Sequence, residues 1–517
     1  MSFKTRFVVL VGLLAPPLAL ATNPPAADVA GPAFFLKSAE PRPVPAGLAE
    51  ACAATIEKAA RFLFSDTGIE NSIRDENGRK VPPYIYHAVI DDDNHFKYRI
   101  SYPAYHHAYL IEAFLNYFNY SGSQEAVRRA RDLADWTIAH STPDDYRWPH
   151  MPWSTFTEGN PGGFEDKDTL QPDKAAYMGL AYVRLYEVLR EARYLAAAKG
   201  IADTLESRQG KDGAWPFRVN PKNGEIYEAY TPGIFMAVAF LEKMYQVTGN
   251  LDYKNAQIAG WMWMLRNPVR NNNWSGFYED VGKGRESHVY YAPAQTIRLL
   301  LRYRTPANEE SYMKHARRLY DYVMDGLAFD DRDMGLLLRE QTGYLAATPS
   351  STLSWSMMAA EFFLATGDEK FRFSALEAMR SVTRYGLKPD GRTHNTMLGG
   401  RVYGDNGSWY SLTSPVIRYI YQDMGCLPEL APPTENHLLR TATEIREISY
   451  SKQRISYESL PESFELLKLA SPPKEVKIGS RLVSRSAGLP AADGWVFNPE
   501  SQVIVIGHKD PRVEVSF

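Results

Sequence analysis

The sequence predicts a mainly α-helical protein: an (α/α)6 toroid of helical hairpins with a small C-terminal β domain. An apolar helical segment preceded by proline recurs six times, and a polar turn and an amphipathic segment follow each of the first five. Hairpins repeated in this way bury their apolar faces by packing on their neighbours. After residue 441 the pattern changes to the alternation and β-branched runs typical of strands.

Proline marks the start of each apolar segment. It is favoured in the first helical turn, where its missing N–H would have no partner. The six prolines lie at intervals of 56 to 69 residues: Pro103, Pro172, Pro232, Pro293, Pro349 and Pro415. They predict inner helices at residues 102–119, 172–188, 232–246, 293–304, 350–365 and 414–425.

The sixth apolar helix has no amphipathic partner after it, because a proline-rich segment begins at Leu427. An amphipathic segment at residues 47–64 can supply that partner from the other end of the chain and close the ring. Closure would bring together Cys52 and Cys426, the two cysteines of the chain. A disulfide between them is one hypothesis, since an exported protein permits oxidation; two buried thiols are the other.

The first 21 residues have the features of a secretory signal peptide. Lys4 and Arg6 precede an apolar run at residues 7–20, and Ala-Leu-Ala at residues 19–21 fits the cleavage rule. We expect a secreted or periplasmic protein that starts near Thr22. The predicted divisions are a proline-rich segment at 22–45, the toroid at 46–426, a linker at 427–440 and the β domain at 441–517. No later apolar run is long enough to predict a membrane span.

The composition excludes several classes of function. A net charge of −3 gives no basic field for nucleic acid. Two cysteines cannot form a cysteine-rich zinc module, and no metal-binding motif occurs, so no cofactor is expected to be required; a structural calcium ion stays compatible with the sequence. Aromatic residues are abundant, with 32 Tyr and 10 Trp. Their flat faces and polar ends suit the binding of sugar rings.

Aromatic and charged residues gather in the long loops that enter the inner helices. Loops on one face of a rigid scaffold commonly form binding sites, so a cleft is predicted at the N-terminal end of the inner helices. An acidic polysaccharide or oligosaccharide is the expected ligand. The substrate-binding candidates are Arg147, His150, Trp153, Trp215, Arg218, Tyr230, Trp274, Trp409 and Tyr410.

The repeat, the signal peptide and the aromatic loops together resemble the toroidal carbohydrate-active enzymes. These include polysaccharide lyases, unsaturated glucuronyl hydrolases and the toroid of glucuronyl C5-epimerases. The resemblance covers about residues 46–426 and identifies no single family. It implies an enzyme that acts on uronic-acid sugars. The turn at residues 209–215 also resembles a turn of terpene-cyclase toroids, but the acidic residues 91–93 do not complete an aspartate-rich DDxxD motif.

Two catalytic chemistries and one non-catalytic function remain open. The main hypothesis is a lyase that cleaves by β-elimination, in which His107 or His288 takes part in proton removal and Tyr291 protonates the leaving oxygen. Arg147, His150 or Arg218 would then neutralise the uronate carboxylate.

The alternative is a glycoside hydrolase on uronic-acid oligosaccharides that uses Asp173 and a second carboxylate such as Glu228. Asp173 also has a structural interpretation, because an acid in a first helical turn complements the helix dipole. The third hypothesis is a sugar-binding protein without catalytic activity, which would keep the aromatic residues and tolerate loss of the histidines and Asp173.

Overall fold

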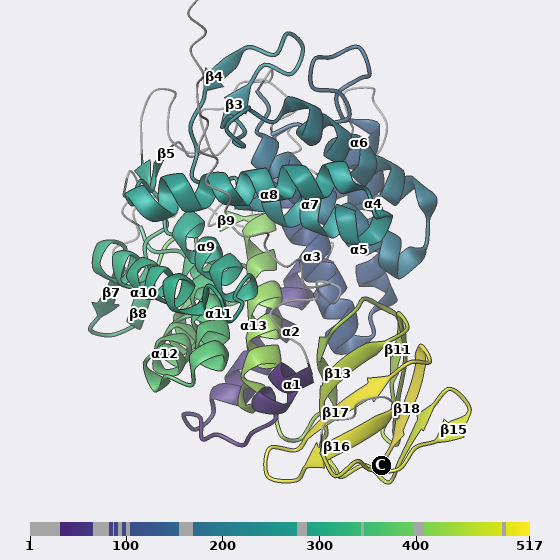
Figure 1. Ribbon diagram of the computed structural model, residues 1–517. Coiled ribbons are helices and arrows are strands. Elements are labelled where there is room, and N and C mark those ends of the chain that lie inside the picture. Colours follow the sequence, from purple (N-terminus) through teal and green to yellow (C-terminus); the bar gives the residue numbers. More distant parts are fainter. Residues whose placement is uncertain are drawn as a thin grey trace, which may run out of the picture.

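The computed structural model describes residues 32–65, 82–85, 87–90, 96–99, 104–154, 169–276, 287–342, 346–397, 408–488 and 493–517. Within these ranges the chain is an (α/α)6 toroid followed by a C-terminal β domain (Figure 1), so the predicted fold class is confirmed. The signal-peptide prediction falls on residues 1–21, outside the described residues. None of the described helices is long and apolar enough to cross a membrane.

Six inner helices form a closed ring. They are α3 (Ala104–Ser121), α5 (Pro172–Leu189), α7 (Phe235–Thr248), α9 (Tyr291–Arg302), α11 (Pro349–Thr366) and α13 (Ser414–Cys426). Each packs on the next, and α13 returns to pack on α3. Two helix starts differ from the prediction: α7 begins three residues after Pro232, and α9 begins two residues before Pro293. Both prolines still fall where an amide would have no helical partner.

Six outer helices pair with the inner ones. Five are the expected partners: α4 (Gln124–Ala139), α6 (Ala192–Arg208), α8 (Leu251–Met264), α10 (Glu309–Gly326) and α12 (Glu369–Tyr385). A π-helical turn, η2 (Leu265–Val269), continues α8. The sixth partner is α2 (Leu48–Phe64), which packs on α13 and closes the ring as predicted.

Ring closure does not join the two cysteines. Cys52 and Cys426 are both buried and both free. The Cys426 Sγ atom instead accepts a hydrogen bond from Arg440 Nη1 at 3.4 Å. Burial raises the pKa of the Cys52 thiol, and the nearby Asp423 raises it further. The structure therefore has the two buried thiols of the second hypothesis.

The inner helices are held by burial on nearly every side, as expected for helices that are apolar all round. In α11 almost every residue up to Leu364 is buried. Thr348 caps this helix, accepting from the backbone N–H of Ser351, whose side chain reaches back to the Thr348 amide. Helices α5 and α7 approach closely at Gly179, where a Cβ atom would lie 2.5 Å from the Phe240 ring.

Short strands lie in the loops around the ring. They are β1 (His87–Ile90), β2 (Phe96–Arg99) and β9 (Ser408–Trp409) in one sheet, with the hairpins β3 (Arg218–Val219) and β4 (Ile226–Glu228), β5 (Ser275–Gly276) and β6 (Ser287–His288), and β7 (Ala328–Asp331) and β8 (Gly335–Leu338). The single turns η1 (Pro83–Ile85), η3 (Tyr410–Thr413) and η4 (Pro428–Leu430) connect other elements.

The β domain consists of two antiparallel sheets. One has the order β10 (His437–Thr441), β13 (Ser463–Lys468), β17 (Val503–His508) and β16 (Gly494–Asn498). The other has the order β11 (Ile445–Tyr450), β12 (Arg454–Ser459), β18 (Arg512–Ser516), β14 (Glu475–Ile478) and β15 (Arg481–Leu482). The first strand begins at His437, inside the predicted linker.

A buried polar cluster joins the two sheets. Glu465 accepts from the Tyr457 hydroxyl at 3.1 Å and from the Ser463 hydroxyl at 2.5 Å, and it pairs with His508 at 2.6 Å. The short helix α1 (Pro32–Ser38) packs on both β13 and α11, so it connects the β domain to the toroid.

Candidate functional site

The two ends of the toroid differ. The hairpin β3–β4 lies beside the N-terminal ends of the inner helices, and the β domain lies at the other end of the molecule (Figure 1). Backbone hydrogen bonds in both directions between Leu170 and Val219 attach this hairpin to the start of α5. At the opposite end, Tyr450 of the β domain donates to the carbonyl of Asn119 near the C-terminus of α3.

Asp173 lies in the first turn of α5, which begins at Pro172. The carboxylate is buried, with 10% of the side chain exposed, and its Oδ2 atom lies 3.5 Å from Lys174 Nζ. Its Oδ1 atom accepts from the Lys174 backbone N–H at 2.9 Å. Gly233 lies opposite, so close that a Cβ atom there would be 3.5 Å from Asp173 Oδ2. An acid and an amine are thus held together at the N-terminal end of the ring.

Aromatic side chains from several inner helices surround this pair. The Lys174 amine lies 5.4 Å from the centroid of the Tyr105 ring and 5.9 Å from that of Tyr291. The Tyr291 ring in turn meets Phe235 edge to face at 5.1 Å. An acid, an amine and aromatic faces on a rigid ring are the groups that a sugar-binding site needs.

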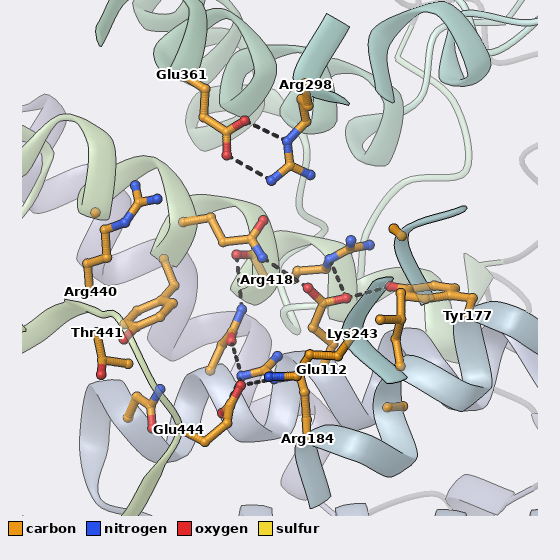
Figure 2. Close-up of a pocket in the computed structure, with 18 of the residues that line it drawn as sticks. Glu112, Tyr177, Arg184, Lys243, Arg298, Glu361, Arg418, Arg440, Thr441 and Glu444 are labelled. Carbon is orange, nitrogen blue, oxygen red and sulfur yellow. Dashed lines mark hydrogen bonds and ion pairs between the residues drawn. The ribbon is translucent and has the colours of Figure 1, made fainter. Parts of the chain in front are cut away.

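A charged layer lies directly below, in the second and third turns of the inner helices (Figure 2). Glu112 accepts from Arg418 Nε at 2.8 Å, from the Tyr177 hydroxyl at 2.5 Å and from Gln422 Nε2 at 3.0 Å. Burial opposes ionisation of Glu112, but Arg418 outweighs it and lowers the pKa of the carboxyl. Burial raises the pKa of the Tyr177 phenol, so this group stays a hydrogen-bond donor.

Arg418 is enclosed by rings as well as by its acid. Its guanidinium carbon lies 5.6 Å from the Tyr109 ring centroid and 5.4 Å from that of Tyr177. One Nη atom donates to the Tyr419 hydroxyl at 3.1 Å. Such a guanidinium keeps a fixed position and a fixed charge beneath the aromatic layer.

The three residues proposed for β-elimination do not converge. His107 is buried against α4, where Nε2 lies 2.8 Å from the Ile85 carbonyl and Nδ1 lies 2.7 Å from the Thr137 hydroxyl. Burial lowers its pKa to about 4, so the ring is neutral. His288 lies 2.6 Å from the Tyr322 hydroxyl on the outer helix α10. Of the three, Tyr291 alone contacts the Asp173–Lys174 pair, through Lys174, and burial raises the pKa of its phenol.

Three aromatic residues expected to stack on sugars are buried instead. Trp215 Nε1 donates to the Leu205 carbonyl at 2.8 Å, and Trp274 Nε1 donates to Asn272 Oδ1 at 3.1 Å. The Tyr410 hydroxyl donates to the Leu63 carbonyl at 2.5 Å, at the closure of the ring. These side chains have at most 2% of their surface exposed and no free face for a ligand. They stabilise the loops and the ring closure.

Trp153, Trp409 and Tyr230 keep part of their surface exposed. Trp153 meets the Tyr146 ring edge to face at 6.3 Å, and Trp409 lies in β9. The Tyr230 hydroxyl donates to the Asn273 carbonyl at 2.7 Å. Their exposed faces remain available for stacking.

The basic candidates separate into surface and buried groups. Arg147 and His150 are exposed on the loop after α4, and His150 lies 3.5 Å from Asp144. Arg218 is fully buried and pairs with Glu228 at 3.6 Å across the β3–β4 hairpin. Since this hairpin is attached to the start of α5, the Arg218–Glu228 pair is the buried charged pair of a loop next to Asp173.

Sequence reasoning missed the residues that form the centre of the site. Lys174, Tyr105, Tyr177, Glu112 and Arg418 were not among the candidates. Polar positions in otherwise apolar helices could have indicated them: Tyr105, Tyr109 and Glu112 are spaced four and three residues apart and therefore share one face of α3. In the part of the chain that the structure describes, no group of three or more His, Cys, Asp or Glu side chains could hold a metal ion.

Comparison with known proteins agrees with the fold and adds a family. The model of Glycosyl Hydrolase Family 88 matches residues 73–289, a region that includes Asp173 and Lys174. No curated protein matches the chain.

Solved structures share the toroid at low sequence identity. A sugar epimerase from a ruminal bacterium is 12% identical, with 71% of this chain and 98% of that chain covered and a TM-score of 0.53. A D-mannose isomerase is 15% identical, with coverages of 74% and 99% and a TM-score of 0.53. A cellobiose 2-epimerase from Spirochaeta thermophila DSM 6192 is 12% identical, with coverages of 74% and 99% and a TM-score of 0.51. The resemblance to toroidal carbohydrate-active enzymes is thus confirmed.

Proposed function

We propose that this protein is a glycoside hydrolase acting on uronic-acid oligosaccharides, with Asp173 as the acid that protonates the leaving oxygen. The observation that carries the proposal is the Asp173 carboxylate, buried at the ring mouth beside Lys174, opposite Gly233 and surrounded by aromatic rings. The match to a glycosyl hydrolase family over this region supports the same chemistry.

The substrate class follows from the charges of the site. Lys174 beside Asp173 and Arg418 below it supply positive charge near a bound sugar, which favours a sugar that carries a carboxylate. The tyrosine rings provide stacking faces. Glu228 is the proposed second carboxylate, because its hairpin is attached to the start of α5. A pair of carboxyl groups is what most glycoside hydrolases use.

The geometry favours hydrolysis over β-elimination, the main hypothesis from the sequence. Elimination needs a base able to remove a carbon-bound proton and an acid close to it. His107 and His288 contact different outer helices, and burial raises rather than lowers the pKa of Tyr291. A protonated phenol can donate a hydrogen bond to a sugar hydroxyl but is a poor base.

Product analysis separates the chemistries. The enzyme is incubated with saturated uronic-acid oligosaccharides and with oligosaccharides that carry an unsaturated uronate at one end. A hydrolase releases reducing ends without new ultraviolet absorbance, or removes the absorbance of the unsaturated end. A rise in absorbance would show elimination and contradict the proposal. Binding without any product would favour the sugar-binding alternative.

Asp173→Asn tests the residue assignment. We expect a fall in kcat of about 100-fold or more, as is typical for loss of a general acid. Asp252→Asn is a matched control, because Asp252 is also the second residue of a helix, α8, and is exposed on the outer ring. Equal activity in the two variants would show that Asp173 only complements the helix dipole.

We also propose that the chain is exported, on the evidence of its first 21 residues. Mass spectrometry of protein recovered from outside the cytoplasm should give an N-terminus near Thr22. Recovery of that protein with Met1 intact would contradict the proposal.

A further inference from the structure

A second polar space lies at the opposite end of the ring from Asp173. It is a cavity of about 320 Å³ lined by all six inner helices and by residues 439–444 of the β domain. Figure 2 shows charged side chains pointing into it from the helices, with Arg440, Thr441 and Glu444 on the β-domain side. The Glu112–Arg418–Tyr177 layer forms its upper wall.

Ion pairs between neighbouring elements form the walls. Lys243 of α7 contacts Glu187 of α5 at 2.8 Å. Arg298 of α9 donates twice to Glu361 of α11, at 2.6 and 2.7 Å. Six basic and four acidic residues line the cavity, and one further acid, Glu242, pairs with Arg302 behind the wall. The walls therefore keep a positive charge in excess.

Several buried polar atoms in these walls have no hydrogen-bond partner among the described residues. They are Gln295 Nε2, Glu187 Oε2 and Gln422 Oε1. Gln295 is 6% exposed and Glu187 is 7% exposed. A buried polar group without a partner costs about 1–3 kcal/mol, so the cavity is suited to a polar occupant and not to an apolar one.

We propose that this cavity is a second ligand site, for a sugar acid of monosaccharide size. Its volume lies at the lower end of the range for small-molecule pockets, about 300–1,000 Å³. The excess positive charge fits a single carboxylate. The mixture of an amide donor with carboxylate and amide acceptors fits hydroxyl groups, which both donate and accept. The site goes beyond the proposed function, because it shares neither Asp173 nor Lys174.

The probe is D-glucuronate, with D-glucose as the uncharged control, titrated by calorimetry into the full-length protein. We expect Gln295→Leu and Lys243→Met each to weaken glucuronate binding at the cavity at least tenfold. Tyr105→Ala, at the ring mouth, should leave the cavity affinity unchanged. Lys370→Met is the matched control for Lys243→Met, because Lys370 forms an exposed ion pair with Asp321. Glucose should bind at least tenfold more weakly than glucuronate.

A crystal structure with glucuronate locates the ligand and decides the matter even where a variant folds poorly. Density for the sugar acid against Gln295 and Lys243 would support the proposal. Water alone in the cavity at saturating glucuronate, or a single binding site that Tyr105→Ala abolishes and Gln295→Leu does not affect, would overturn it. Because binding is measured without turnover, failure of the hydrolase proposal would leave this result intact.

Discussion

Glu112 holds together side chains of two inner helices beneath the candidate site. Its carboxylate contacts Tyr177 of α5 and both Arg418 and Gln422 of α13. We expect Glu112→Gln to lower the free energy of unfolding by about 3 kcal/mol, since loss of one partner leaves the other charge buried. Urea unfolding measures this value. Glu369→Gln removes an exposed partner of Arg372, 70% exposed, and should cost less than about 1 kcal/mol; equal losses would contradict a structural role for Glu112.

His107 predicts a particular dependence of stability on pH. Burial lowers its pKa to about 4 from an ordinary value of 6.5, so the unfolded chain binds more protons between these two values. Stability contributed by the neutral ring is therefore present above pH 6.5 and is lost as the pH falls towards 4. The full loss is about 3 kcal/mol. Unfolding free energies of the native protein and of His107→Gln, compared across this range, should converge at low pH; parallel curves would contradict the assignment.

At the residue scale the sequence indicates some site positions and not others. Asp173 is recognisable because it is an acid in the first turn of an apolar helix. His106 and His107 are adjacent and point about 100° apart, so their sequence alone cannot decide which one faces the axis. Trp215 lies in a long loop like a ligand-binding residue, but the Leu205 carbonyl that binds its indole N–H is contributed by the preceding helix.

Close packing of α5 on α7 depends on Gly179. A Cβ atom there would lie 2.5 Å from the Phe240 ring, closer than two carbon atoms can approach. We expect Gly179→Ala to destabilise the protein by about 1–3 kcal/mol, because the helices must separate.

Gly326→Ala is the matched control for Gly179→Ala. Gly326 ends α10 and has no atom within 4 Å of an added Cβ. This change should be neutral or stabilise the protein by up to about 1 kcal/mol. Thermal denaturation of both variants compares them; equal melting temperatures would contradict the close contact.

At the element scale the prolines predict the helices well because their effect is local. The absence of an N–H restricts proline to the first turn whatever the tertiary structure. The exact first residue depends on contacts beyond the local sequence. Helix α9 starts at Tyr291, before Pro293, and the amide of Tyr290 bonds to the Glu340 carbonyl in a distant loop.

The toroid and the β domain share an extensive contact. Arg184 of α5 pairs with Glu444 at 2.7 Å, and Tyr120 of α3 stacks on His437 with ring centroids 3.8 Å apart. We expect a single calorimetric transition, with equal calorimetric and van't Hoff enthalpies. Two resolved transitions would show that the β domain unfolds on its own. Arg184→Met should lower the transition temperature without splitting the peak.

At the scale of the whole molecule, repetition makes the ring predictable, whereas the cavity is not. The repeat fixes the number of hairpins and their order. The cavity near Gln295 depends on the distance between Lys243, Arg298 and Glu444, which come from three different parts of the chain. No periodic pattern in the sequence records that distance.

The pairing of α13 with α2 has a consequence for synthesis on the ribosome. The first outer helix is made early and waits for its partner until nearly four hundred further residues have been translated. Until then the hairpins form an open arc, with the Cys52 face of α2 and one side of α3 uncovered. Nascent chains are therefore vulnerable to aggregation over most of their translation, and a holdase chaperone that covers α2 protects the seam on which the finished ring depends.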